Sequence, residues 1–294
     1  MEEKANCGCE EGKGCGCKEE KDCGCGEGKD CGCESEETKT PVPGKIPVNN
    51  FSEVKNVIAV MSGKGGVGKS SVTSLLACGF RKKGFEVGVL DADITGPSLP
   101  RMFGVKGLLE ATPFGLLPSE SSTGIKVMSM NLLMHDEDEP VIWRGPVLSN
   151  TVKQFWTEVV WDYLDYLFVD LPPGTGDVPL TVMQSLPLNG LIVVTSPQDL
   201  AAMIVKKAVK MANLMNIPIM GLIENMSGAV CPKCGEEFQL FGPGHGREVA
   251  EKFNLRFLGS LPVDPELSVL CDEGKIEDYK SDIFTNVIPE ILLQ

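Results

Sequence analysis

The stretch Gly63–Ser70, GKGGVGKS, matches the phosphate-binding pattern G-x-x-x-x-G-K-[ST]. It follows an apolar run and precedes an apolar helical pattern, as the motif requires. Its glycines let successive backbone N–H groups turn toward phosphate, and the helix N-terminus adds a partial positive charge. We expect Lys69 to reach the β- and γ-phosphates and the Ser70 hydroxyl to ligate Mg²⁺. The predicted nucleotide-binding residues here are Gly63, Lys64, Gly65, Gly66, Val67, Gly68, Lys69, Ser70 and Ser71.

Three aspartates follow apolar runs elsewhere in the chain. Asp91 and Asp93 end the run EVGVLDAD, and Asp170 ends the run YLFVDLP. In open α/β sheets, ligands gather at the carboxyl ends of the strands, where these side chains are expected. The segment PPGTGD after Asp170 has the glycines of a switch loop that responds to the γ-phosphate. We therefore expect the three carboxylates to belong to the phosphate site.

A second kind of chemistry is indicated by Cys231 and Cys234 in the sequence CPKCG. This spacing is typical of a metal-binding knuckle. A tetrahedral thiolate site for zinc or an iron–sulfur cluster needs four ligands, and the pair supplies two. Cys78 lies in an apolar helical pattern, which is more typical of core than of a ligand, and Cys271 is also single. The sequence around Cys231 and Cys234 therefore does not identify the other two ligands of a four-thiolate site.

The first forty residues contain eight further cysteines in CGC pairs that repeat every eight residues: Cys7, Cys9, Cys15, Cys17, Cys23, Cys25, Cys31 and Cys33. Residues 1–40 contain 12 acidic and 6 basic residues, a net charge of −6, and have no side chains to build a core. Such a segment is predicted to be disordered unless a soft metal (Zn²⁺, Cu⁺ or an iron–sulfur cluster) orders it. Residues 41–50 are predicted to be a proline-rich linker, and 51–294 one domain.

Composition narrows the possible partners and location. The 294 residues carry a formal net charge of −14, which argues against non-specific binding of nucleic acid or anionic lipid. No secretory signal and no apolar run of membrane-spanning length are present. We expect a cytoplasmic protein with neither a nucleic-acid nor a membrane partner. In that reducing compartment, clustered cysteines favour metal binding over disulfides.

Elements that would position these groups are indicated by apolar patterning. Strands are expected at 56–62, 86–93, 125–130, 166–172, 191–196, 217–225 and 256–262. Helices are expected at 69–83, 146–160, 179–186, 199–214, 245–253, 265–273 and 281–293. The strands are continuous apolar runs, as in parallel sheets covered on both faces. This alternation predicts an α/β fold with a doubly wound, mostly parallel sheet of the P-loop NTPase type.

Lys64, the second residue of the loop, makes the chain resemble the deviant P-loop ATPases, which include MinD, ParA and the nitrogenase iron protein. Further motifs resemble the Mrp-type iron–sulfur cluster carriers of that family: WRGP at 143–146, DLPPGTGD at 170–177, IENMS at 223–227 and LPVDP at 261–265. The resemblance spans residues 57 to about 270. It covers the predicted domain and none of the cysteine-rich tail.

Several residue roles are implied by this resemblance. Lys64 would cross a dimer interface to contact the ATP of the partner subunit, and Asp93 would orient the attacking water. Asp170 would hold Mg²⁺ through water, with Asp91 assisting at the metal. The adenine would be contacted by Asn225 and by the segment that includes Pro262 and Asp264.

A two-fold dimer offers an answer to the missing ligands, because it brings a second copy of Cys231 and Cys234 opposite the first. The resemblance implies that the four thiolates bridge a 4Fe-4S cluster. A zinc knuckle between subunits suits the same ligands, and tail thiolates completing the site are a third possibility. A tail without a specific metal role is a further alternative.

By resemblance, the protein would be a slow, Mg-ATP-dependent ATPase that holds a labile 4Fe-4S cluster as a homodimer and transfers it to apo-proteins. One alternative is an ATP-driven electron donor of the nitrogenase iron-protein type. Another is a metal-storage protein that uses the tail. A MinD-type positioning ATPase is disfavoured, because the C-terminal sequence YKSDIFTNVIPEILLQ has one lysine and an interior proline where a basic membrane helix is expected.

Overall fold

A computed structural model describes residues 45–292, except 95, 97, 135–144, 198–200, 232 and 281–282. The eight tail cysteines and residues 143–144, the first half of the WRGP motif, lie outside the described residues. The assignment of residues 1–40 to a separate metal-binding segment therefore stays a prediction. In the part of the chain that is described, no helix is long and apolar enough to cross a membrane.

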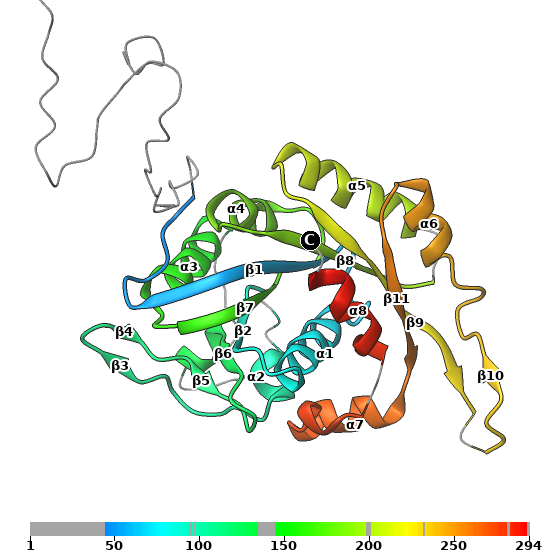
Figure 1. Cartoon of the computed structure of the whole chain (residues 1–294), viewed down its shortest axis with the longest axis horizontal. Helices are drawn as coiled ribbons and strands as arrows, with labels where there is room; N and C mark the ends of the chain where they lie inside the picture. The colour runs from blue at the N-terminus through cyan, green and yellow to red at the C-terminus, as the bar shows by residue number, and fades with distance from the viewer. Residues whose placement is uncertain are drawn as a thin grey trace, which may run out of the picture. The chain divides into compact units, whose positions relative to one another are not determined.

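A mostly parallel sheet forms the centre of the domain (Figure 1). Its described strands run in the order β10-β9-β8-β1-β7-β2-β6-β5, with β11 also paired to β9. The antiparallel pairs are β10 with β9 and β5 with β6, both at the ends of this order. The strands are β1 (Ser52–Ser62), β2 (Val87–Asp91), β5 (Ser119–Glu120), β6 (Lys126–Met128), β7 (Asp162–Asp170), β8 (Gly190–Thr195), β9 (Ile219–Val230), β10 (Glu237–Phe238) and β11 (Phe257–Val263).

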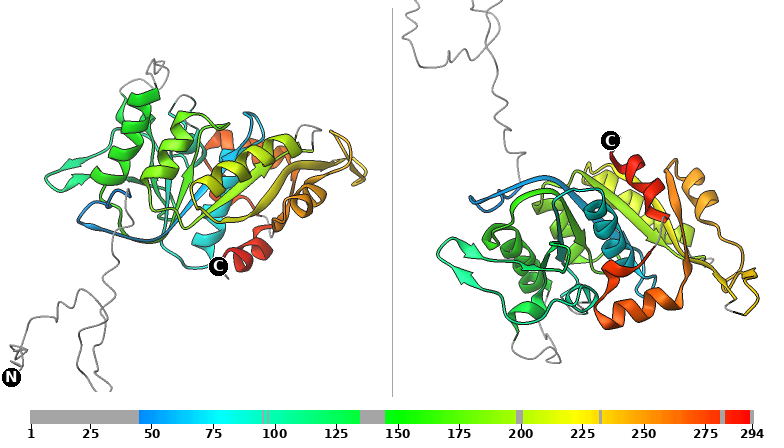
Figure 2. Two further views of the ribbon diagram at one scale, coloured as in Figure 1. Left: turned by 90° about the horizontal axis from the view of Figure 1, so that it is seen from above. Right: turned by 60° about the horizontal axis from the view of Figure 1, so that its bottom comes forward.

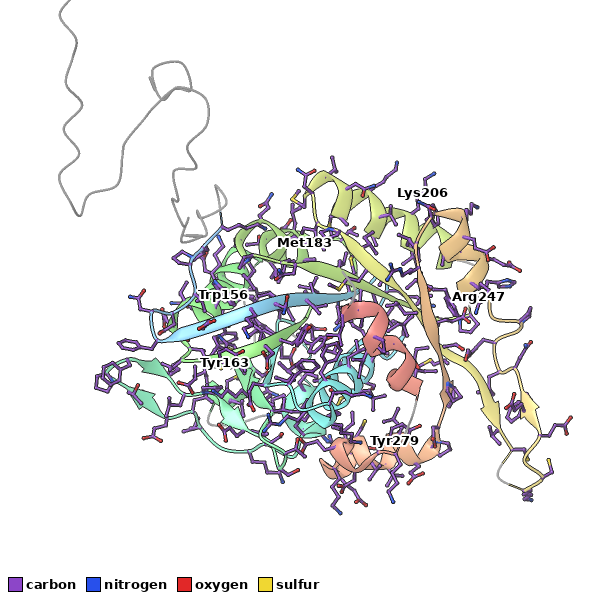
Figure 3. The ribbon with its side chains drawn as sticks, in the orientation of Figure 1. Trp156, Tyr163, Met183, Lys206, Arg247 and Tyr279 are labelled. Atoms are coloured by element: carbon purple, nitrogen blue, oxygen red, sulfur yellow. The ribbon has the colours of Figure 1, made fainter. Side chains whose placement is uncertain are left out.

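Helices cover both faces of the sheet, as Figures 1 and 2 show. One face packs against α3 (Gly145–Glu158), α4 (Asp177–Ser185), α5 (Ala201–Leu214) and α6 (Gly246–Lys252). The other packs against α1 (Lys69–Lys82), α2 (Leu99–Met102) and α8 (Ile283–Leu292), with α7 (Pro265–Glu273) beside them. Trp156 and Met183 lie on the first side and Tyr279 on the second (Figure 3). The doubly wound α/β prediction is confirmed.

Side chains of strand β1 contribute to the hydrophobic cores on both faces of the sheet. Val57, Ala59 and Met61 belong to the core under α3–α6, whereas Ile58 and Val60 belong to the core under α1 and α8. Successive side chains of a strand point to opposite faces, so a continuous apolar run fills both cores at once. Every residue of β2 and β8 is buried for the same reason.

The predicted helices are present, with ends that differ by one or two residues where both ends are described. The shortest elements were missed. These are strands β3 (Ala111–Thr112), β4 (Gly115–Leu116), β5 and β10, helix α2, and the 3₁₀ turns η1 (Met130–Leu133) and η2 (Ile276–Asp278). Two to four residues cannot display a helical or alternating period, so patterning does not detect them.

The described end of the predicted linker packs against the domain. The Ile46 N–H donates to Ser185 O at 2.8 Å, and Trp156 Nε1 donates to Ile46 O at 2.9 Å. Ile46 and Val48 pack against the core under α3 and α4. Residues 45–48 are thus held to the domain before β1 begins.

Candidate nucleotide site and cysteine arm

The phosphate loop joins the end of β1 to the start of α1. Gly66 and Gly68 have φ values of 77° and 75°, in the left-handed region that favours glycine. Gly68 is required for a second reason, because a Cβ built there would lie 2.1 Å from Asn225 Nδ2. A Cβ on Gly63 would lie 1.5 Å from Ile204 Cγ2 of α5. The loop is therefore held closely between two neighbouring elements.

The two chemically active residues at the start of α1 converge on Asp170, at the end of β7. Lys69 Nζ forms an ion pair with Asp170 Oδ2 at 2.7 Å, and Ser70 Oγ donates to the same oxygen at 2.6 Å. Asp170 is fully buried and Lys69 is 6% exposed. An ion pair shielded from water is stronger than one at the surface. The predicted phosphate and metal ligands therefore occupy one buried cluster.

The remaining oxygen of Asp170 is taken by a residue that sequence reasoning missed. The buried Thr73 hydroxyl donates to Asp170 Oδ1 at 2.7 Å, with the carbonyl of Lys69 3.0 Å away. Thr73 lies four residues after Lys69, so both side chains lie on one face of α1. That spacing was a signal available from the sequence.

Asp91 lies at the same strand edge, since it pairs with Asp170 across β2 and β7. It accepts the N–H of Asp93 at 3.1 Å and that of Ser98 at 3.2 Å. Burial, followed by the negative charge of Asp170, raises the pKa of Asp91 to about 8, opposed by the charge of Lys69. Its carboxylate therefore holds the start and the end of the loop after β2, while its predicted role at the metal stays a prediction.

A pocket of about 220 Å³ opens beside this cluster. Its lining includes the predicted residues Gly65, Gly66, Lys69, Ser70, Ser71 and Asp93. Pro173, from the loop after Asp170, also lines it, and the Gly174 N–H of that loop donates to Ser62 O at 2.8 Å. Lys64 and Asp93 are half-buried. The structure thus brings the predicted phosphate residues and Asp93 around one opening.

The donor set fits a magnesium nucleotide. A serine hydroxyl and a carboxylate oxygen 2.6 Å apart are hard oxygen ligands of the type that Mg²⁺ prefers. The first turn of α1 contributes no acidic side chain of its own, which suits an anion at the helix N-terminus.

The residues predicted to contact adenine lie in three different places, unlike the phosphate residues. The Asn225 amide donates to Val67 O of the phosphate loop at 2.8 Å and is buried. Asp264 caps α7 by accepting the Glu266 N–H at 2.9 Å, and its other oxygen accepts the Tyr279 hydroxyl at 2.7 Å. Pro262 lines a different pocket, described below. Their contact with adenine stays a prediction.

The two body cysteines of the CPKC motif lie on a projecting segment, residues 227–244, which we call the cysteine arm. Its stem is an antiparallel ribbon in which Ala229 pairs with Phe238 and Val230 with Glu237. At its turn, the Cys231 N–H donates to Glu236 O and the Gly235 N–H to Cys231 O, both at 2.9 Å. The arm extends away from the helices (Figure 1).

Both thiols are accessible, Cys231 half-buried and Cys234 exposed. Backbone N–H groups of Cys234 and Lys233, together with the Cys234 side chain, lower the pKa of Cys231. This favours the thiolate, which is the form that binds metals. By contrast, burial raises the pKa of Cys78 to about 12.

Cys271 is half-buried in α7, and burial raises the pKa of its thiol, opposed by a hydrogen bond with Ser71. Among the described residues, no group of three or more His, Cys, Asp or Glu side chains is placed to hold a metal ion. His245, predicted to lie at a helix start, precedes α6, and its ring contacts Glu248. In the described part of the chain, Cys231 and Cys234 are thus the two cysteines that lie together on the arm, and their role as metal ligands stays a prediction.

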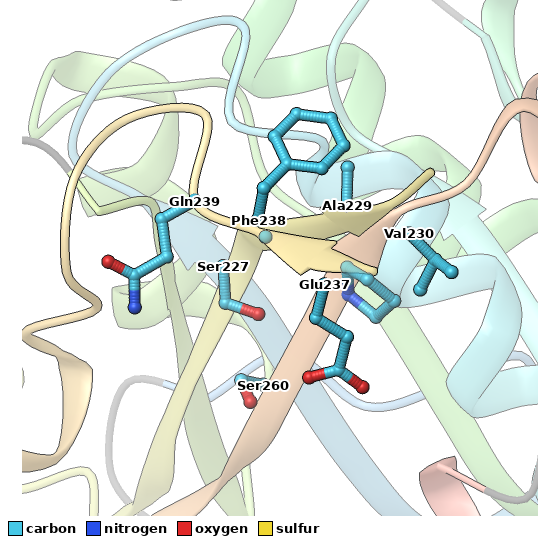
Figure 4. A pocket seen from close by; sticks show the side chains of 9 residues that line it. Ser227, Ala229, Val230, Glu237, Phe238, Gln239 and Ser260 are labelled. Atoms are coloured by element: carbon cyan, nitrogen blue, oxygen red, sulfur yellow. The ribbon is translucent and has the colours of Figure 1, made fainter. Parts of the chain in front are cut away.

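A pocket of about 410 Å³ lies at the stem of the arm (Figure 4). Residues lining it include Ser227, Val230, Glu237, Gln239, Ser260 and Pro262. The described exposed apolar residues Val230, Phe238, Leu240 and Phe241 also lie on the arm and are 46–51% exposed.

The model of a P-loop NTPase family described as NUBPL iron-transfer P-loop NTPase matches residues 53–292. The chain belongs to this family. An iron-sulfur cluster carrier protein of Clostridium perfringens is 46% identical over 249 residues, covering 82% of this chain and 87% of the relative. The cytosolic Fe-S cluster assembly factor CFD1 of Chaetomium globosum is 43% identical over 253 residues, covering 81% and 84%.

The same relationship extends to solved structures. A nucleotide-binding protein from Archaeoglobus fulgidus, solved in complex with ADP, is 44% identical with a TM-score of 0.71. The match covers 79% of this chain and 91% of that protein. Family membership identifies this chain as a P-loop NTPase, as its motifs predicted.

Within this iron-transfer NTPase, a second residue that sequence reasoning missed is Glu224. It is 3% exposed, and its Oε1 accepts the N–H groups of His245 at 3.0 Å and Gly246 at 2.7 Å. Twenty-one residues separate Glu224 from His245, so the contact depends on the path of the whole arm. No local sequence pattern predicts this contact.

Proposed function

We propose that this NTPase is a Mg-ATP-dependent carrier that binds a labile 4Fe-4S cluster between two copies of the chain and transfers it to apo iron–sulfur proteins in the cytoplasm. The observation that carries the proposal is the cysteine arm. It presents Cys231 and Cys234 together, with a lowered pKa at Cys231, on a member of an iron-transfer family. The names of the relatives from C. perfringens and C. globosum support the same cargo.

In the nucleotide half of the proposal, the phosphate-loop N–H groups and Lys69 bind the phosphates of ATP. The Lys69 ammonium has three N–H donors, so it shares them between the phosphates and Asp170, and its ion pair with Asp170 is weakened. Ser70 and Asp170 would hold Mg²⁺, which when bound neutralises charge on the phosphate oxygens. Asn225, Pro262 and Asp264 would contact the adenine.

In the hydrolytic half, Asp93 orients the attacking water, and Lys64 of each subunit contacts the nucleotide of the other. Asp91 fixes the loop that carries Asp93, since it accepts the Asp93 N–H itself. Turnover is slow, because hydrolysis waits on closure of the loops after β2 and β7.

The homodimer supplies the full ligand set. Each arm contributes two thiols, and two-fold symmetry doubles them to the four that a 4Fe-4S cluster requires. The apolar residues Val230, Phe238, Leu240 and Phe241 beside the cysteines favour a protein-covered surface there. Transfer is an exchange of ligands: thiolates of the recipient replace the arm thiolates, with no net oxidation or reduction.

The experiment that tests this proposal uses the full chain with the eight tail cysteines replaced by serine, so that tail metal does not enter the count. The protein is reconstituted anaerobically with iron and sulfide, and iron, sulfide, zinc and oligomeric mass are measured together. A matched variant carries Cys231→Ser and Cys234→Ser in addition. Transfer is followed by activation of an apo 4Fe-4S enzyme.

We expect about one cluster per dimer, following four thiolates per cluster. The matched variant should lose the cluster and any cluster-dependent dimer yet still bind ATP. One cluster per monomer would exclude the bridge. Stoichiometric zinc without sulfide would indicate a structural zinc knuckle, and a cluster that survives redox cycling without transfer would indicate an electron donor. Absence of metal from this protein, together with metal in the chain that keeps its tail cysteines, would indicate a storage protein that uses the tail.

A further inference from the structure

Two consecutive residues of β9 hold two different parts of the molecule. The Asn225 amide is fixed to Val67 O of the phosphate loop, and the adjacent Glu224 carboxylate is fixed to the N–H groups of His245 and Gly246. Neighbouring side chains in a strand point to opposite faces. β9 therefore contacts the phosphate loop on one side and, on the other, the start of α6, which directly follows the cysteine arm.

Both contacts are close enough to transmit a displacement. A Cβ on Gly68 would lie 2.1 Å from Asn225 Nδ2, and a Cβ on Gly244 would lie 2.4 Å from Glu224 Oε2. A Cβ on Gly246 would lie 2.8 Å from Glu224 Cβ. Glycine at these positions lets the backbone approach the two β9 side chains directly.

Between these contacts and the cysteines, β9 departs from regular pairing. Asn225 pairs with Leu261 of β11, but the next pair joins Ala229 to Val263, so β9 contains two extra residues there. Met226, within this bulge, has a left-handed φ of 62°. Bulges bend a strand and redirect its continuation. The direction of the arm is thus set between Asn225 and Ala229, directly after the residue that contacts the phosphate loop.

We propose that Glu224 is a positioning residue that fixes the return end of the cysteine arm to β9, so that nucleotide binding at the phosphate loop changes how the arm holds its cargo. This inference rests on the proposed carrier function. Nucleotide entry acts on Val67 and Gly68, which contact Asn225, and Glu224 passes the resulting shift of β9 to the segment that closes the arm.

The geometry supplies a matched pair of variants. Both N–H groups donate to Oε1 of Glu224, so Glu224→Gln keeps the accepting oxygen, whereas Glu224→Leu has a similar volume and no acceptor. Gly244→Ala disturbs the same contact from the arm and serves as a second variant where Glu224→Leu folds poorly. None of these changes removes a predicted nucleotide or cluster ligand.

The test measures two quantities on the full chain, with and without a non-hydrolysable ATP analogue and Mg²⁺. The first is the rate at which an iron chelator removes the reconstituted cluster, and the second is amide hydrogen exchange over residues 236–250. The coupling is expressed as the fold-change of each rate between the nucleotide-bound and the nucleotide-free protein. Coupling between two sites is typically about 5- to 150-fold.

We expect the wild type and Glu224→Gln to show a ratio of at least about fivefold in cluster release. Glu224→Leu and Gly244→Ala should reduce that ratio toward one while nucleotide affinity changes less than about threefold. Unchanged ratios in both variants would overturn the inference. A wild type that binds no cluster would instead contradict the carrier function. In that case the hydrogen-exchange measurement still tests the role of Glu224. A nucleotide effect on exchange over residues 236–250 that is unchanged in both variants would reject that role.

Discussion

Lys69 Nζ and Asp170 Oδ2 form a buried ion pair of 2.7 Å, and the Ser70 hydroxyl donates to the same oxygen. All three groups are predicted to engage a Mg-nucleotide. In the structure, the ammonium and the hydroxyl are held in place by the carboxylate that is predicted to face the metal. ATP binding at this site would then be an exchange of partners within one cluster.

Replacing Lys69 by alanine is expected to abolish Mg-ATP binding, because the ammonium that neutralises the phosphates is lost. The substitution also leaves the buried Asp170 without its cation, at a typical cost of about 3–5 kcal/mol of unfolding free energy. Calorimetric titration with ATP and thermal unfolding measure the two effects. Wild-type ATP affinity in this variant would contradict the phosphate-loop assignment.

Asp93→Asn should bind ATP normally and hydrolyse it about 10²- to 10⁴-fold more slowly, because the water-orienting carboxylate is removed. Phosphate release under saturating ATP measures the loss. Asp162→Asn, an exposed carboxylate at the start of β7 and at the other end of that strand from Asp170, is the matched control. Equal turnover in the Asp93 variant and this control would assign the water-orienting role to another residue.

Thr73→Val keeps the volume of the side chain but leaves Asp170 Oδ1 without its donor. A buried unsatisfied acceptor costs about 1–3 kcal/mol, and the carboxylate loses the contact that fixes its orientation. We expect the Mg²⁺ concentration for half-maximal ATPase activity to rise about tenfold, a change worth 1.4 kcal/mol. Thr73→Ser should restore the wild-type value, and failure of that rescue would reduce Thr73 to a packing role.

The raised pKa of Asp91 makes a prediction about pH. Because its pKa is about 8 in the folded chain, above the ordinary value near 4, its contribution to stability is full below about pH 4 and is lost as the pH rises through 8. Without nucleotide, the difference in unfolding free energy between Asp91→Asn and the wild type should therefore shift in favour of the variant as the pH rises, by at most about 1.4 kcal/mol per pH unit. Urea unfolding at pH 5.5, 7 and 8.5 tests this, and parallel profiles would refute it.

Removal of residues 1–40, or replacement of all their cysteines by serine, should leave ATPase activity and cluster content of the arm unchanged. The tail sequence has no aromatic, Val, Leu or Ile side chain with which to join the core. Iron and sulfide analysis beside the ATPase rate measures this. Loss of iron from the remaining chain would make the tail thiolates ligands of the Cys231–Cys234 site.

Short patterns in the sequence predicted residues that the structure brings together around the phosphate loop. The glycines and Lys69 of the phosphate loop occupy one continuous stretch, and Asp91 and Asp170 follow apolar runs that a parallel sheet aligns by its register. Thr73 was within reach, since it lies one helical turn from Lys69. A single threonine is tolerated in an apolar helix, so its hydroxyl alone does not predict a site residue.

Other features depend on contacts between distant segments. The link from Glu224 to His245 exists because the arm returns to β9, and the pairing of Asn225 with Val67 O spans 158 residues. The stem of the arm uses the two-residue strand β10, too short to display a period. Such contacts follow from the assembled topology, which determines what an individual side chain meets.

The cysteine arm contributes no side chain to either core cluster of the described chain. Loading and emptying the two thiols, as proposed, would therefore leave both core clusters in place, in contrast to metal-dependent folds that collapse when their ion is removed. Cargo occupancy would then not decide whether the chain is folded, although β9 still couples the arm to the phosphate loop. A carrier that has given up its cluster would remain folded and competent to be loaded again.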